Sequence, residues 1–330
     1  MNSEFIIFSD MHYYKNTQRS IPDIKYLSSW IKSQIEITEQ IFSYARDNSI
    51  ETVIYNGDLF EEKNRIDQSL YNLVWATYKD YYNQGFRIIF NSGNHDILTF
   101  SRQSSLKPFS QIVDVIQSPA TFYNDTEFRF IPHDMLNGNL EIDKHYSFHV
   151  LFTHADIADL NYGSIGVKSL SMIKPDIFKD WSVVFNGHVH RPQTHKNIVN
   201  IGSPMIQDFG EEGEEKRFIH YKDKTWKSIV LNCPKFITLP GLSPKIKKVI
   251  DKNDRDFFRV NISVEELIDP IFKKYNVVPH IIKSKKREVR LVDSDSDTDD
   301  IKNYLEIVDC IHFDKERLEV IGKELINEII

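Results

Sequence analysis

The chain has 330 residues, 41% of them hydrophobic, which suits one large globular domain or a main domain with a smaller companion. Its formal net charge of -7 excludes a protein that binds nucleic acid through overall positive charge alone. With two cysteines and no long apolar run, a disulfide framework, a cysteine-based zinc site and a membrane span are also excluded. We therefore expect a cytoplasmic protein with reduced thiols and no secretion signal.

The first hundred residues alternate short apolar runs with stretches whose apolar residues recur at helical spacing. We expect strands at 5–8, 52–55 and 86–90, and helices at about 23–48 and 67–83. Such alternation is typical of the crossover units of an α/β domain.

After about residue 112 the pattern changes to short strands separated by turn residues. We expect these strands at 113–116, 121–123, 128–131, 149–153, 183–186, 197–201, 218–221 and 228–231. We interpret them as a second sheet stacked on the first. Residues 1–235 are therefore predicted to form the main domain, an α/β two-sheet sandwich flanked by helices.

Beyond residue 235 prolines separate short strands and helices, such as a helix expected at 264–275. We expect residues 236–292 to form a small α+β capping domain, with a basic run at 283–290 that fits a DNA contact or a solvent-facing strand equally well. Residues 293–300 are an acidic run typical of a linker. Residues 301–330 show two amphipathic helical patterns, which cannot bury their apolar faces alone and are expected to dock on a partner.

Five short polar blocks carry the chemistry, and each follows a short apolar run. They are Asp10-Met11-His12, Gly57-Asp58, Gly93-Asn94-His95-Asp96, His154 and Gly187-His188-Val189-His190. Together they offer carboxylate, amide and imidazole ligands for two divalent cations, a set that suits Mn²⁺, Fe²⁺ or Zn²⁺ better than Ca²⁺. Two cations held close together need a shared carboxylate, and Asp58 is our choice. A site of this kind hydrolyses phosphate esters.

The order of these blocks resembles the calcineurin-like metallophosphoesterase superfamily, whose pattern is D-x-H, G-D, G-N-H-D/E, H and G-H-x-H. The resemblance implies a first metal held by Asp10, His12, Asp58 and His190, and a second held by Asp58, Asn94, His154 and His188. It also implies that His95 stabilises the transition state or protonates the leaving oxygen, and that Asp96 orients that histidine. Four further histidines lack such a motif, and we interpret them as ordinary surface or core residues: His133, His145, His149 and His195.

Two flanking motifs resemble the SbcD-type DNA double-strand-break repair nucleases, in particular their small phage-encoded members. One is Leu59-Phe60 directly after Asp58; the other is Gly202-Ser203-Pro204, followed by a Phe-Gly-Glu-Glu run and by Lys216-Arg217-Phe218. Some of these relatives have a histidine directly after the phenylalanine, where this chain has Glu61.

The SbcD resemblance implies a two-metal DNA nuclease, an exonuclease on duplex ends and an endonuclease on single strands. Mn²⁺ is the expected metal, with Mg²⁺, Fe²⁺ or Zn²⁺ as alternatives. The implied partners are DNA, an SbcC-like SMC-type ATPase bound through residues 301–330, and a second copy of the chain packed through helices around 66–84 and 103–112. The implied location is the cytoplasm of a phage-infected host.

Two other functions are compatible with the sequence. One is a stand-alone phosphodiesterase that acts on nucleotides or small molecules without a partner. The other is a non-enzymatic adaptor for DNA ends or for the ATPase, with a degenerate site. The complete ligand set argues against the adaptor, because drift usually removes a ligand.

Overall fold

The structure is a computed structural model that describes residues 4–98, 103–133, 135–136 and 140–282. The predicted linker at 293–300, the helical pair at 301–330 and the basic run at 283–290 lie outside the described residues. Residues up to His280 form one compact unit. The expected boundary between residues 235 and 236 stays a prediction.

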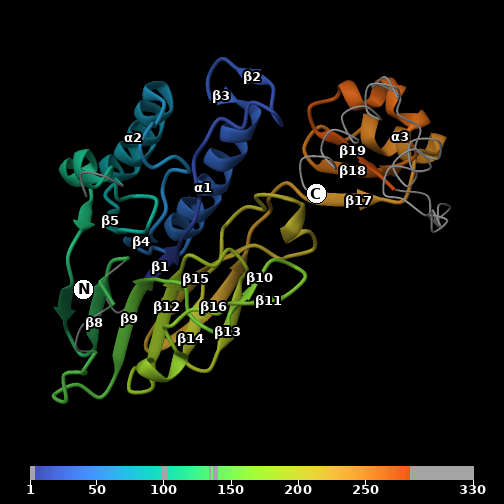
Figure 1. Ribbon diagram of the computed structural model, residues 1–330. Helices are drawn as coiled ribbons and strands as arrows, with labels where there is room; N and C mark the ends of the chain where they lie inside the picture. The colour runs from blue at the N-terminus through green and yellow to red at the C-terminus, as the bar shows by residue number, and fades with distance from the viewer. Residues whose placement is uncertain (1–3, 99–102, 134, 137–139, 283–330) are drawn as a thin grey trace, which may run out of the picture. The chain divides into compact units, whose positions relative to one another are not determined.

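The first sheet has six strands in the order β16-β15-β1-β4-β5-β6 (Figure 1). Its parallel strands are β1 (Glu4–Phe8), β4 (Thr52–Asn56), β5 (Arg87–Asn91) and β6 (Asp114–Ile116). An antiparallel hairpin completes it, formed by β15 (Arg217–Lys222) and β16 (Thr225–Val230). The strands β1 and β4 are almost wholly buried, because helices cover one face and the second sheet covers the other.

Two helices cover the first sheet, α1 (Ser29–Asp47) and α2 (Gln68–Asn83). Both begin at side-chain caps: Ser28 accepts the Ile31 N–H, and Asp67 accepts the Leu70 N–H. The first helix therefore begins later than the predicted residue 23. The hairpin of β2 (Pro22–Asp23) and β3 (Leu27–Ser28) occupies the preceding residues.

The second sheet has the order β13-β14-β12-β9-β8-β7. Its central strands β8 (Glu127–Ile131), β9 (His149–His154), β12 (Val183–Gly187) and β14 (Ile198–Asn200) are parallel, and the edge strands β7 (Ala120–Tyr123) and β13 (Gln193–His195) are antiparallel. Aromatic and branched residues from both sheets form the core between them. The predicted α/β two-sheet sandwich is confirmed, but the strands expected near 113–116, 218–221 and 228–231 belong to the first sheet.

The described part of the capping region is a three-stranded sheet with its own small apolar core. It comprises β17 (Phe236–Leu239), β18 (Phe257–Ile262), β19 (Val277–Ile281) and helix α3 (Pro244–Asp251). The helix expected at 264–275 is wrong: two short 3-10 helices stand there, η4 (Glu265–Ile268) and η5 (Pro270–Lys273). Pro270 has no N–H to continue a helix, and Asp269 caps the second segment instead.

The remaining elements are short. They are β10 (Asn161–Tyr162), β11 (Val167–Lys168) and the 3-10 helices η1 (Lys107–Gln111), η2 (Pro175–Phe178) and η3 (Phe209–Glu211). Within the described residues, every helix is too short or too polar to cross a lipid bilayer.

Buried asparagines join the carboxyl ends of strands from both sheets. Asn56, the last residue of β4, donates to the Thr153 carbonyl of β9, 2.8 Å away, and accepts from Asn91 at the end of β5, 3.0 Å away. In the second sheet, Asn186 of β12 donates to Asn200 of β14, 2.9 Å away. Because these groups are buried, their hydrogen bonds fix the strand ends relative to one another. The five polar blocks begin at this edge of the sandwich.

Candidate metal centre

The polar blocks follow strand ends in strained backbone conformations. Asp10, His12, Asp58 and His188 all have positive φ, between 49° and 84°. Side chains in this left-handed region cost free energy, and such residues gather at functional sites. Gly57 (φ 100°) permits the close approach, because a Cβ there would lie 2.2 Å from Nδ1 of His154.

The structure brings six of the seven predicted ligands into two groups. In each group the carboxylate oxygens and imidazole nitrogens lie within 4.8 Å of one another; the groups are Asp10, His12 and His190, and Asp58, His154 and His188. Each group contains three of the four residues of one predicted metal set: the first lacks Asp58 and the second lacks Asn94. The seventh residue, Asn94, lies against the second group, with its Oδ1 2.8 Å from Nδ1 of His188.

The Asp58 carboxylate lies between the two groups. Its Oδ2 is 3.6 Å from Nε2 of His12 in the first group and 3.2 Å from Nε2 of His154 in the second. Its Oδ1 accepts the backbone N–H of His95 at 2.7 Å. This position suits an anion shared by two cations, the role that the sequence predicted for Asp58.

Three imidazoles are oriented by partners on Nδ1. His154 donates to the Asn56 carbonyl (2.7 Å), His190 donates to Oε1 of Glu211 (2.9 Å), and Nδ1 of His12 lies 2.8 Å from Oε2 of Glu61. A proton on Nδ1 leaves the Nε2 atom of each ring facing the cluster, where a cation can take the place of the second proton that metal-free His154 holds. This is the arrangement by which proteins orient metal-binding histidines and raise their basicity.

Two buried polar atoms at the cluster support a divalent cation. Oδ2 of Asp10 and Nε2 of His154 are inaccessible to solvent and form no hydrogen bond. Unpaired buried polar atoms are costly, and a cation that accepts both lone pairs removes the cost. The donor set of carboxylates and imidazoles fits the metals predicted from the sequence.

The electrostatics of the cluster also favour a cation. Burial disfavours the charged form of His154, but the negative charges of Asp58 and Asp10 outweigh it and raise the pKa of His154 to about 10. Burial likewise opposes ionisation of Asp58, yet His154 and His12 hold its pKa well below the usual range. The cluster therefore concentrates negative charge that a bound cation neutralises.

The predicted catalytic pair has different contacts from those expected. Nδ1 of His95 lies 2.5 Å from the Glu61 carbonyl, and the His95 ring meets the His12 ring edge-on with centroids 4.7 Å apart. Asp96 is fully buried and accepts backbone N–H groups of Asp58, Gly93 and Leu59. The backbone of Glu61, and not Asp96, therefore orients His95, while Asp96 braces the loops that carry the ligands. Burial, together with the nearby Asp58, raises the pKa of Asp96 to about 6.

A buried network of charged side chains supports His190. The sequence did not predict this network. Glu211 accepts from the His190 ring and from Nζ of Lys216, at 2.9 and 2.8 Å. Lys216 also donates to the His190 carbonyl at 3.1 Å, to Ser203 Oγ at 3.0 Å and to Glu214 at 2.9 Å. The sequence signal for this network was in the Gly-Ser-Pro, Gly-Glu-Glu and Lys-Arg-Phe motifs, which contribute Ser203, Glu211 and Lys216.

Of the four histidines interpreted as ordinary residues, three lie away from the metal cluster and one lies beside it. His149 pairs with buried Glu127, His145 is exposed beside Asp143, and His195 lies on edge strand β13. His133 instead stacks against the His188 ring at a centroid distance of 5.9 Å. It therefore lies at the edge of the metal cluster.

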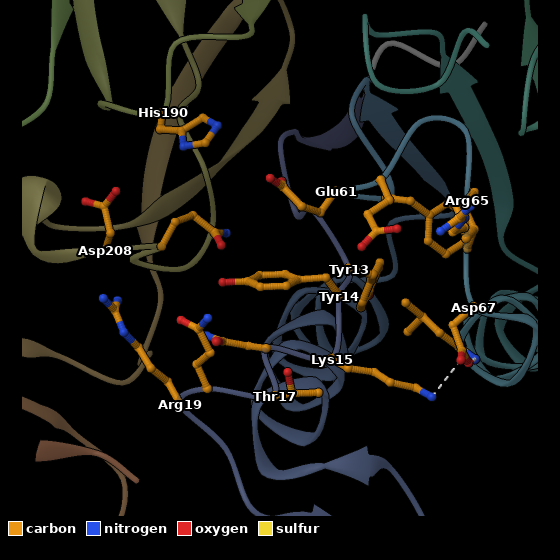
Figure 2. A pocket seen from close by; sticks show the side chains of 17 residues that line it. Tyr13, Tyr14, Lys15, Thr17, Arg19, Glu61, Arg65, Asp67, His190 and Asp208 are labelled. Carbon is orange, nitrogen blue, oxygen red and sulfur yellow. Dashed lines mark hydrogen bonds and ion pairs between the residues drawn. The ribbon is translucent and has the colours of Figure 1, made fainter. Parts of the chain in front are cut away.

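A cleft of about 750 Å³ opens beside the first group (Figure 2). Its walls come from segments 13–19, 60–62 and 65–67 and from Leu70, His190, Gln207 and Asp208; Figure 2 shows His190 and Asp208 across the cleft from Arg65 and Asp67. Lys15 pairs with Asp67 across 2.8 Å, and the Arg19 guanidinium lies over the Phe209 ring, 5.6 Å from its centroid. The cleft thus places cationic and aromatic side chains next to Glu61 and His190.

Comparisons with known proteins find similarity to a curated protein and to solved structures. One curated relative, "Exonuclease subunit 1" of Enterobacteria phage T4, is 23% identical over 316 residues, which cover 93% of this chain and 89% of the relative. A dimetal phosphatase from Danio rerio is 10% identical over 69% of this chain and 96% of its own, with a TM-score of 0.42. A nuclease from Pseudomonas putida is 11% identical over 50% of this chain and 66% of its own, with a TM-score of 0.28.

The family model that matches is that of the calcineurin-like phosphoesterases, over residues 3–220. That range contains both six-stranded sheets except β16 and the end of β15, and all five polar blocks. The match confirms the resemblance stated from the sequence and the expectation of a metal-dependent enzyme that hydrolyses phosphate esters. With its sandwich fold and its two groups of ligand side chains around Asp58, the chain belongs to the calcineurin-like phosphoesterase family.

Proposed function

We propose that this protein is a two-metal DNA nuclease that cleaves phosphodiesters as an exonuclease on duplex ends and an endonuclease on single strands. The observation that carries the proposal is the position of Asp58 between His12 and His154, with ligand atoms of both groups around it. When bound, two divalent cations at this place neutralise phosphate charge and make water a better nucleophile. We assign Asp10, His12, Asp58 and His190 to one cation, and Asp58, Asn94, His154 and His188 to the other.

The chain's own residues then position the reaction. His95 lies at the margin of the cluster, and burial lowers its pKa, which favours the neutral ring. Its Nδ1 proton is held by the Glu61 carbonyl, so Nε2 carries the lone pair; once it has taken up a proton from solvent, it can give that proton to the leaving oxygen. Asp96 keeps the Asp58 and Gly93 loops together and does not itself reach the substrate.

DNA as the substrate is supported by the cleft and by the relative. The cleft of about 750 Å³ has the size of sites that take a ligand as large as a nucleotide. Arg65, Arg19 and Lys15 line it as candidate phosphate contacts, and Tyr14 offers a ring on which a base can stack. The phage T4 relative is named as a subunit of an exonuclease, which favours a strand end as the substrate.

We extend the proposal to the assembly in which the nuclease works. The relative is a subunit, which is consistent with a partner protein. We propose that an SbcC-like SMC-type ATPase is that partner, bound by residues 301–330, that a second copy of the chain completes the complex, and that the complex acts in DNA recombination and repair in the host cytoplasm. Mn²⁺ is the proposed metal, because the site mixes imidazole nitrogen with carboxylate and amide oxygen.

The test is a cleavage assay on linear plasmid and on single-stranded circles, with Mn²⁺, with and without the ATPase. Asp58→Asn keeps the shape of the side chain and removes the shared charge, so we expect cleavage to fall at least about a hundredfold. The control is His195→Asn on edge strand β13, which should cleave as the wild type does.

Three outcomes separate the alternatives. Metal-dependent DNA cleavage that is lost in Asp58→Asn supports the nuclease. Turnover of nucleotides or of a small chromogenic diester with no cleavage of DNA identifies a stand-alone phosphodiesterase. Binding of DNA or of the ATPase with no hydrolysis of any ester identifies an adaptor.

A further inference from the structure

His133 lies at the carboxyl end of a parallel strand of the second sheet, as do two of the assigned ligands, His154 and His188. The neighbouring parallel strands β8, β9 and β12 each have a histidine at the carboxyl end: His133 two residues after β8, His154 as the last residue of β9, and His188 directly after β12. The register pairs Ile131 with Thr153 and Gly187 with His154. Because parallel strands end at one edge of a sheet, the three imidazoles meet there.

The contacts of His133 join three segments that carry ligands. Its ring lies nearly parallel to the His188 ring, at an angle of 24° and with centroids 5.9 Å apart, and it forms a T-shaped pair with the His154 ring at 6.2 Å. Its Nδ1 lies 2.9 Å from the backbone carbonyl of His154, to which it donates. Its own backbone N–H donates to the carbonyl of Ser92, two residues before Asn94.

We propose that His133 is a positioning residue of the second metal group, outside the five motif blocks. The inference rests on the proposed role of His154 and His188 as ligands. Three contacts restrain the His188 ring: the hydrogen bond with Asn94, the edge-on His154 ring at 5.5 Å, and the stack against His133. Removal of the His133 ring takes away the stacking contact of the His188 ring, leaves that ring less restrained, and releases the His154 carbonyl.

His133 is not assigned as a ligand. Its Nδ1 proton is used by the His154 carbonyl, and its nitrogens are not part of either group of ligand atoms. It contacts the ligands His154 and His188 without binding the metal itself. Loss of a residue that orients metal ligands in this way typically lowers metal affinity by about 10–100-fold.

The test measures Mn²⁺ binding to the full-length protein by titration calorimetry and by electron paramagnetic resonance. The wild type should bind two ions, with the spectrum of a spin-coupled pair. We expect His133→Ala to weaken one of the two binding steps by about 10–100-fold and to delay the coupled signal to higher Mn²⁺, with the other step unchanged. The Mn²⁺ affinities of His133→Phe, which keeps a ring, and of His133→Gln, which keeps a donor, should lie between those of the wild type and of His133→Ala. His195→Ala, a histidine of the same sheet that belongs to neither ligand group, is the matched control.

Unchanged binding steps in a folded His133→Ala protein would overturn the proposal. So would an equal loss at both sites, or a loss in His133→Phe as large as in His133→Ala, because either result indicates general structural damage. If His133→Ala does not fold, the comparison of the Phe and Gln variants decides. Failure of the wild type to bind two ions would instead overturn the proposed function, so the two failures can be told apart.

Discussion

The buried Lys216 gives the sharpest prediction. Its side chain is inaccessible to solvent, and its single positive charge faces the carboxylates of Glu211 and Glu214, at 2.8 and 2.9 Å. Lys216→Met keeps most of the side-chain volume and removes the charge and every hydrogen-bond donor. Two buried carboxylates then lose their cation. Removal of one partner from a buried ion pair costs about 3–5 kcal/mol, and we expect Lys216→Met to lower the free energy of unfolding by that amount.

The assay is urea denaturation followed by far-ultraviolet circular dichroism, with chelator present so that bound metal does not contribute to stability. The matched control is Lys222→Met at the other end of β15. Lys222 is 56% exposed and pairs with Glu4 at 3.1 Å, and an exposed pair of this kind is worth about 0–1 kcal/mol. A double substitution that also replaces Glu211 with Gln should recover part of the loss, because it removes one of the unpaired charges.

Two results would refute this reasoning. One is a Lys216→Met loss no larger than that of the Lys222 control. The other is a double variant, Lys216→Met with Glu211→Gln, that is less stable than Lys216→Met alone by the full cost of an independent Glu211→Gln substitution. Mn²⁺ affinity at the first group should fall in parallel, because Lys216 and Glu211 together hold the ring and the carbonyl of His190.

Three further predictions concern pH, substrate and partner. Burial opposes ionisation of Glu211, but His190 and Lys216 outweigh burial and lower the pKa of Glu211 to about 2. With chelator present, the contribution of ionised Glu211 to the free energy of unfolding should be complete above about pH 5 and should fade as the pH falls towards 2. Glu211→Gln should remove this part of the acid-unfolding curve. Arg65→Ala should raise the KM for DNA and reduce the slope of log affinity against log salt by about 1, while turnover of a small diester stays unchanged; an unchanged slope would exclude Arg65 as a phosphate contact. Deletion of residues 301–330 should spare the small diester and abolish ATPase binding, and a truncated protein that still binds the ATPase would contradict the docking role.

Local patterns predicted the positions of most strands and the meeting of the polar blocks. Buried strands appear as short apolar runs, and the carboxyl ends of parallel strands converge, so motifs at strand ends can be placed together before their partners are known. Asp58 could be chosen as the shared carboxylate because only a shared anion offsets two close cations. In the structure its Oδ2 lies between the imidazoles of His12 and His154, and its role as the shared ligand stays a prediction.

Other features depend on contacts between distant segments. The hairpin of β15 and β16 joins the first sheet through pairing with β1, more than 200 residues earlier, and no local pattern specifies that partner. His133 stands without a flanking motif, so its place beside His188 follows only from the registers of β8 with β9 and of β9 with β12. Lys216 and Glu211 look like surface charges in sequence, because burial of a charge pair is decided by what packs around it.

The asparagine bonds at the strand ends bear on how the two halves of the sandwich hold together. Asp10 and Asp58 extend from the first sheet, whereas His154 and His188 extend from the second. Cations bound among them would tie the sheets to each other at the edge where Asn56 already bridges β4 and β9. Metal binding is then linked to the cohesion of the sandwich itself, so that loss of the ions loosens the fold along the seam where catalysis takes place.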